Sequence, residues 1–147
     1  MDLVKEQLPE VSADNILAEP IHRNTAPSMA WANHRISMMN PNACVIATPS
    51  DQAIFNEEAF RKNVLEGLAF VAENNHFLTM GVKPTRPEPG YGYIQMGDVL
   101  CDNIYQVQSF TEKPERDFAK IFMESGEFYW NTGLFLSNVS YLRKCFC

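Results

Sequence analysis

Two short apolar runs on either side of a capped helix most constrain the fold of this chain. Residues 43–48 and 77–82 are mostly apolar and are bounded by turn residues. Between them, Asn56 has the side chain of a helix N-cap, and apolar residues then recur every three or four positions up to residue 71. A strand, a helix and a strand in this order indicate an α/β fold with a largely parallel sheet.

The remaining elements follow from the same patterns. The run at 43–48 is continuously apolar, which predicts a strand buried on both faces. Residues 91–111 contain two strands in succession, which we expect to pair antiparallel. The same patterns predict strands at 15–19, 91–96 and 104–111, partly extended chain at 128–136, a turn at 97–98, and helices at 24–39 and 116–124.

Size and charge exclude several classes of protein. The chain has 147 residues, which suits one domain with its own core. Its net charge of −6 argues against a nucleic-acid-binding surface, and no apolar stretch is long enough to cross a membrane. None of the four cysteines has a partner at zinc-site spacing. We therefore expect reduced thiols and a cytoplasmic location.

The run Gly90-Tyr91-Gly92-Tyr93 combines two glycines with two tyrosines. In an extended segment the tyrosines would share one face and the glycines the other. Glycine in a strand usually marks a place where something approaches the backbone closely. The run therefore predicts a bare strip of backbone N–H and C=O groups for a ligand rich in hydroxyls. A tight turn that enters a strand is the alternative.

Asp51 follows the buried run at 43–48. In open α/β sheets, ligands bind beyond the carboxyl ends of the strands. A carboxylate at that place is a natural Mg²⁺ ligand, because Mg²⁺ takes one or two protein carboxylates together with phosphate and water oxygens. The alternative is an aspartate that caps the turn at 49–52.

Glu112 and Lys113 stand at the end of a predicted strand, directly before Pro114. Neighbouring residues of a regular strand face opposite sides, but the break at the proline could turn both side chains toward one pocket. A carboxylate accepts hydrogen bonds from sugar hydroxyls, and an ammonium attracts phosphate. An exposed ion pair at a strand end is the alternative.

Two further segments carry groups suited to ligands. Asn131 offers a donor and an acceptor to a vicinal diol, and Gly133 permits close backbone approach; a structural turn is the alternative. Asn24 and Thr25 open a predicted helix, whose free N–H groups suit an anion or a purine edge. A simple helix cap is the alternative there.

Taken in order, these segments resemble the mannose-1-phosphate guanylyltransferases, also called GDP-mannose pyrophosphorylases. The resemblance covers nearly the whole chain, and it implies a Rossmann-like nucleotidyltransferase fold with helices on both faces of the sheet. It also implies that GTP and α-D-mannose 1-phosphate react to give GDP-mannose and pyrophosphate, with Mg²⁺ as cofactor. Five blocks carry it: residues 23–27 (RNTAP), 49–51 (PSD), 90–94 (GYGYI), 110–114 (FTEKP) and 130–133 (WNTG).

The resemblance also implies a role for each candidate residue. Asp51 is expected to bind the metal ion, and Lys113 to bind the sugar phosphate as a second catalytic group. Glu112 is expected to bind mannose hydroxyls. The remaining substrate-binding residues are Asn24 and Thr25 near the guanosine, and Gly90, Tyr91, Gly92, Asn131 and Gly133 around the sugar.

The chain departs from the family pattern in one important respect. The glycine-rich, arginine-containing loop that cradles the GTP phosphates in the family does not occur in residues 1–147. Smaller departures are Gln52, where the family usually has histidine, and Thr132, where serine is common. We therefore expect an internal piece of one nucleotidyltransferase domain, truncated at both ends and inactive by itself.

Two other functions stay open at this point. The chain could come from a transferase for another hexose 1-phosphate or another base. It could also be a non-catalytic module that binds sugar phosphates. The oligomeric state is likewise open, and a homodimer is one arrangement to test.

Overall fold

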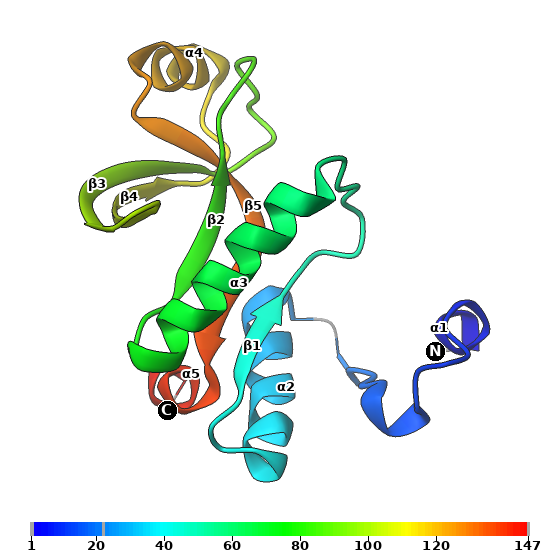
Figure 1. The fold of residues 1–147 in the computed structure, drawn as a ribbon. Coiled ribbons are helices and arrows are strands. Elements are labelled where there is room, and N and C mark those ends of the chain that lie inside the picture. Colours follow the sequence, from blue (N-terminus) through cyan, green and yellow to red (C-terminus); the bar gives the residue numbers. More distant parts are fainter. Residues whose placement is uncertain (1, 22, 147) are drawn as a thin grey trace.

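The computed structural model describes residues 2–21 and 23–146 as one sheet with helices around it (Figure 1). Its helices are α1 (Asp2–Gln7), a 3₁₀ turn at Ala13–Asn15, α2 (Thr25–Met39), α3 (Glu57–Glu73), α4 (Arg116–Ser125) and α5 (Val139–Cys145). Its strands are β1 (Cys44–Ala47), β2 (Leu78–Val82), β3 (Tyr93–Cys101), β4 (Ile104–Thr111) and β5 (Phe128–Asn138).

Strand β5 is the centre of the sheet. Its first half pairs with β2 through Trp130 and Val82, and with β3 through Trp130 and Tyr93. Its second half pairs with β1 and again with β2. Strand β4 continues the sheet beyond β3 as a hairpin, with Tyr93 opposite Thr111. β5 is the last strand in the sequence, and it pairs with β1, β2 and β3, which all precede it.

The α/β class is confirmed, but the prediction of a mostly parallel sheet is wrong. Every pairing between the described strands is antiparallel. The strand–helix–strand unit does set β1 and β2 in the same direction. They do not pair, however, because β5 lies between them and runs opposite to both.

The core lies where helices meet β5. In Figure 1, α3 crosses in front of the sheet, whereas α2 lies behind β1. Val71 of α3 and Leu134 and Leu136 of β5 are buried. Asn33 of α2 donates a hydrogen bond from Nδ2 to the carbonyl oxygen of Val139, 3.2 Å away, at the start of α5. Helix α3 thus packs on β5, and α2 is attached to α5, which follows β5 directly.

The other predicted elements agree with the structure only in part. The three long helices and the antiparallel pairing of β3 and β4 are confirmed. The strand at 15–19 is wrong: among the described residues this segment pairs with no strand, and it lies away from the sheet (Figure 1). The turn at 97–98 is also wrong: these residues lie inside β3, next to an irregularity of its pairing.

The strand at 43–48 is real but is not buried on both faces. It is shorter than predicted, covering only Cys44–Ala47, and Ile46 is 38% exposed. The reason is position, since β1 stands at the end of the strand order. Among the described residues, no helix has the length and the apolar character needed to cross a membrane.

Asn138 joins three elements, and its replacement by alanine should be costly. Oδ1 accepts a hydrogen bond from the Tyr141 amide at 2.8 Å as the cap of α5, and Nδ2 donates to the carbonyl of Val71 at 2.9 Å. Loss of the cap and of a half-buried hydrogen bond should lower the free energy of unfolding by about 2 kcal/mol. Urea unfolding followed by circular dichroism measures this value.

The matched control is Asn56→Ala, which removes only the cap of α3, where Oδ1 accepts from the Ala59 amide. We expect a loss of about 1 kcal/mol. Equal effects of the two substitutions would contradict the role assigned to Asn138.

Candidate functional site

The irregular stretch Trp130–Gly133 of β5 is the base of the candidate site. Gly133 has a left-handed φ of 73°, which a residue with a side chain adopts only with strain. The pairing of β2 with β5 shifts register at this stretch. The resulting bulge re-aims the side chains around it, as bulges commonly do near binding sites.

Asn131 is held by its side-chain oxygen. Oδ1 accepts hydrogen bonds from Thr79 Oγ1 at 2.9 Å and from the Gly133 amide at 3.2 Å. Nδ2 takes part in none of the hydrogen bonds found among the described residues. The side chain is thus oriented by β2 and by the bulge, and it keeps a donor for a ligand.

Gly92 lies where three segments meet. Its carbonyl accepts a hydrogen bond from the Asn131 amide at 2.8 Å. A Cβ at position 92 would lie 3.0 Å from Oε2 of Glu112 and 3.0 Å from Cζ of Phe110. The carboxylate of Glu112 therefore rests directly on the glycine, and no side chain fits between them.

The structure corrects the predicted backbone strip around Gly92. The Gly90 amide donates to Oε1 of Glu88, and the Gly92 carbonyl is also engaged. The tyrosines do not share a face: Tyr93 is fully buried, whereas Tyr91 is 44% exposed. The reason is that β3 begins only at Tyr93, so residues 89–91 form a turn rather than a strand.

Glu112 and Lys113 form an exposed ion pair at the end of β4, which is the alternative to a shared pocket. Lys113 Nζ is 3.2 Å from Oε1 of Glu112, and both side chains are exposed. Lys113 has a left-handed φ of 46°, an uncommon conformation for a residue with a side chain. Such strain is often found at functional sites, because the surrounding structure must hold it.

The loop that carries Asp51 is attached to the bulge of β5. Gln52 donates a hydrogen bond from Nε2 to the carbonyl of Thr132. A Cβ at Gly133 would lie 3.3 Å from Cγ of Pro49. Residues 49–52 therefore sit against the base of the site, although 80 residues separate Gln52 from Thr132.

Asp51 has the chemistry for a magnesium ligand. It is exposed in the loop that follows β1. Among residues 2–21 and 23–146, no three His, Cys, Asp or Glu side chains gather closely enough to form a metal centre. Mg²⁺ commonly uses a single protein carboxylate with phosphate and water oxygens, so the lone carboxylate of Asp51 fits such an ion.

Asn24 and Thr25 are not bonded to this cluster in the described part of the chain. Asn24 precedes α2 with a left-handed φ of 65° and makes no side-chain cap. The Ser28 hydroxyl lies 2.9 Å from the carbonyl oxygen of Asn24 and 2.7 Å from Oε1 of Glu19, and its one proton is shared between these two acceptors. In the part of the chain that the structure describes, no hydrogen bond or ion pair joins either residue to Gly92 or Glu112.

Sequence reasoning missed Arg86 and Glu88. Arg86 donates to Oε2 of Glu88 from Nε at 3.2 Å and from Nη2 at 3.1 Å. The Gly90 amide, and then the Arg86 guanidinium, hold the pKa of Glu88 below its usual value. The spacing Arg-x-Glu directly before the Gly-Tyr run was the only available signal, and such pairs are common on surfaces.

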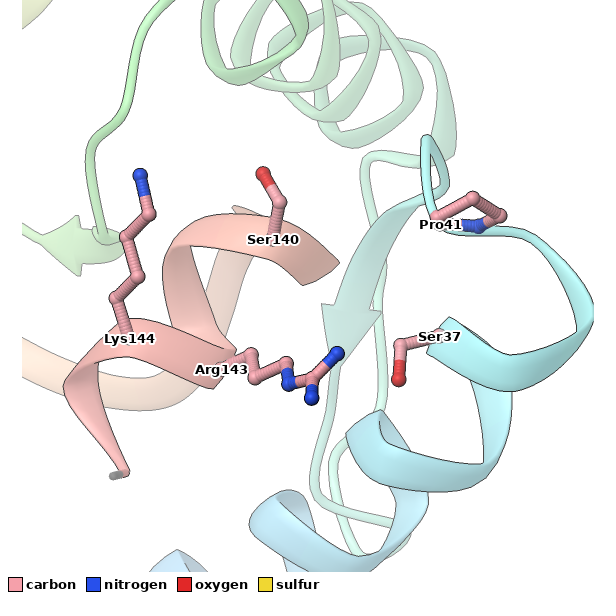
Figure 2. Close-up of a pocket in the computed structure, with 5 residues that line it drawn as sticks. All are labelled: Ser37, Pro41, Ser140, Arg143 and Lys144. Atoms are coloured by element: carbon pink, nitrogen blue, oxygen red, sulfur yellow. The ribbon is translucent and has the colours of Figure 1, made fainter.

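A separate hollow between α2 and α5 is a poor candidate for a site. It has a volume of about 370 Å³ and is lined by Ser37, Pro41, Ser140, Arg143 and Lys144. Figure 2 shows that the Arg143 guanidinium points toward Ser37, whereas the Lys144 ammonium points away from it. Because its polar groups diverge, this hollow gives no common point for a ligand, and no predicted site residue lines it.

Comparison with curated proteins gives close relatives of one kind. The chain is 40% identical over 147 residues to the mannose-1-phosphate guanylyltransferase RfbM of Salmonella typhimurium, covering 97% of this chain and 30% of the relative. It is 39% identical to a mannose-1-phosphate guanylyltransferase of Salmonella montevideo, covering 91% of this chain and 30% of the relative. The chain thus spans about 30% of the length of these relatives.

Solved structures agree on the fold. A mannose-1-phosphate geranyltransferase of Thermus thermophilus superposes with a TM-score of 0.79 at 27% identity, over 88% of this chain and 38% of that one. A mannose-6-phosphate isomerase of Helicobacter pylori gives 0.78 at 28% identity, over 95% and 52%. The family model described as nucleotidyl transferase matches residues 2–145. This chain therefore belongs to the nucleotidyl transferase family.

Proposed function

We propose that the protein containing this chain transfers a guanylyl group from GTP to α-D-mannose 1-phosphate, giving GDP-mannose and pyrophosphate. One observation carries the proposal: the carboxylate of Glu112 lies 3.0 Å from the point that a Cβ would occupy at Gly92, while the Gly92 carbonyl accepts a hydrogen bond from the Asn131 backbone amide. Three distant segments thus bring the Glu112 carboxylate, an acceptor, and the Asn131 side chain, whose Nδ2 is a donor, together at Gly92. This combination suits a sugar.

Glu112, Asn131 and Lys113 would each contact a different part of mannose 1-phosphate. Glu112 accepts hydrogen bonds from mannose hydroxyls, and Asn131 Nδ2 donates to the sugar. Lys113 attracts the phosphate group of mannose 1-phosphate. An oxygen of this phosphate group attacks the α-phosphorus of GTP while the bond to the leaving pyrophosphate breaks. Transfer of this type depends mainly on positioning and on charge stabilisation.

Asp51 would hold Mg²⁺, whose charge offsets that of the phosphates when it is bound. Asn24 and Thr25, at the start of α2, are proposed to lie near the guanosine. We also propose a cytoplasmic location, since the exposed thiols of Cys101 and Cys145 suit a reducing compartment.

A substrate panel tests the proposal. The complete reading frame that contains this chain is expressed, and pyrophosphate release is measured for nucleoside triphosphates paired with hexose 1-phosphates. GTP with mannose 1-phosphate should give the highest kcat/KM. A preference for another pair would indicate a different hexose-1-phosphate nucleotidyltransferase. Binding of sugar phosphate without pyrophosphate release would indicate a binding module. Light scattering of the same sample tests for a homodimer.

The 147-residue chain alone should not turn over. It contains no glycine-rich loop whose amides could cradle a triphosphate. Chromatographic assay for GDP-mannose, with GTP, mannose 1-phosphate and Mg²⁺ present, should give no product above a protein-free control. Product formation by residues 1–147 alone would show that the GTP site is complete without that loop.

A further inference from the structure

Glu88 uses both carboxylate oxygens to organise the turn before Gly92. Oε1 accepts the Gly90 amide at 3.1 Å, and Oε2 accepts two donors of Arg86 at 3.1 and 3.2 Å. The backbone amide of Glu88 donates to the hydroxyl of the fully buried Tyr93 at 3.0 Å. Glu88 is therefore attached to the core by its backbone and to the turn by its side chain.

Arg86 extends this arrangement to β5. Its guanidinium carbon lies 5.4 Å from the ring centroid of Trp130, within the range of a cation–π contact. Tyr91 meets the same indole edge-on, with ring centroids 5.3 Å apart. The indole Nε1 is buried, and no hydrogen-bond partner for it exists among the described residues. Arg86 and Tyr91 thus both contact the Trp130 indole.

The result is a closed set of contacts around the candidate sugar site. Trp130 directly precedes Asn131, and the Asn131 amide binds the carbonyl of Gly92. Movement of the turn at Gly90 would therefore reach Gly92, and with it the carboxylate of Glu112 that rests on the glycine. Neither Arg86 nor Glu88 is among the residues assigned to the substrate.

We propose that Arg86 and Glu88 are positioning residues that fix the Gly90–Gly92 turn against Trp130 and so set the spacing of Gly92, Glu112 and Asn131 for a hexose 1-phosphate. This inference rests on the proposed function. A purely structural role would be weak, because the two residues are two apart in sequence and the Arg86 side chain is 58% exposed. Exposed ion pairs of this kind contribute little to folding stability.

The test uses the complete reading frame and the variants Glu88→Ala and Glu88→Gln. Loss of a charge-assisted hydrogen bond to the Gly90 amide should raise KM for mannose 1-phosphate about tenfold in Glu88→Ala. Glu88→Gln keeps an acceptor for that amide and should raise it only about threefold. KM for GTP should not change in either variant, and the melting temperature should fall by no more than a few degrees.

Two further variants sharpen the result. Glu124→Gln removes a carboxylate from the exposed pair Lys120–Glu124 on α4, where Nζ and Oε1 are 3.8 Å apart, and should leave both KM values unchanged. Arg86→Met should act through the same contacts as Glu88→Ala. The double variant should therefore be less than about twofold worse than Glu88→Ala, as expected for coupled neighbours.

Calorimetric titration with mannose 1-phosphate keeps the inference separate from the transferase reaction. If the wild type binds mannose 1-phosphate and Glu88→Ala binds it equally well, the inference is wrong and the proposed function stands. A change of KM for GTP as large as that for mannose 1-phosphate would overturn the inference too. A wild type that neither binds nor converts any hexose 1-phosphate refutes the proposed function and the inference together.

Discussion

Gly92→Ala is expected to lower kcat/KM for mannose 1-phosphate about tenfold, because the new Cβ moves its neighbours by a few tenths of an ångström and a misplacement of about 1 Å costs about a hundredfold. The new Cβ would lie 3.0 Å from Oε2 of Glu112 and 3.0 Å from Cζ of Phe110. Both neighbours are exposed and can move, so the fold survives. The movement takes the carboxylate of Glu112 away from the sugar. Initial rates at several concentrations of mannose 1-phosphate measure the loss.

The matched control is Gly126→Ala, at the end of α4. Gly126 has a φ of 74°, and a Cβ there meets nothing within 4 Å. Alanine should therefore lower the free energy of unfolding by about 1–2 kcal/mol through backbone strain alone. Its kcat/KM should stay at the wild-type value. Equal losses of kcat/KM in the two variants would mean that Gly92 acts through stability and not through Glu112.

The sequence predicted the helices well because their signals are local. Asn56 caps α3 as expected, and Gly126 ends α4 with a left-handed φ. The arrangement of the sheet is not a local property. Nothing in the sequence of β5 indicates that this 11-residue strand lies between β1 and β2 and pairs antiparallel with both. The parallel sheet was therefore the wrong inference from a correct strand–helix–strand pattern.

The candidate site shows the same division. The residue types of Gly92, Glu112 and Asn131 were readable, because glycine, carboxylate and amide groups each have a limited set of functions. Their convergence depends on the register between β3, β4 and β5. Arg86 and Glu88 were missed because their importance comes from the Gly90 amide and the Trp130 ring, which only the folded turn brings to them.

Lys113 gives the second large effect, and it separates function from folding. Lys113→Gly removes the ammonium that we assign to the sugar phosphate, so kcat/KM should fall about 10²–10³-fold, as for other single groups that stabilise charge in a transition state. Glycine also relieves the strain of a left-handed residue, worth about 1–2 kcal/mol. Against this, glycine gives the unfolded chain more conformational freedom, which lowers the free energy of unfolding by about 0.4–1 kcal/mol.

The protein should therefore keep its stability to within about 1 kcal/mol while its activity falls sharply. Asp102→Gly is the matched control, because Asp102 has a φ of 36° in the turn between β3 and β4. The same relief of strain applies there, but no predicted site residue lies in that turn, so activity should be unchanged. Thermal unfolding and initial rates on the complete reading frame give both quantities. If Lys113→Gly retained wild-type kcat/KM, the ion pair with Glu112 would be only a surface contact, and the phosphate of the sugar would have to be bound by another cation.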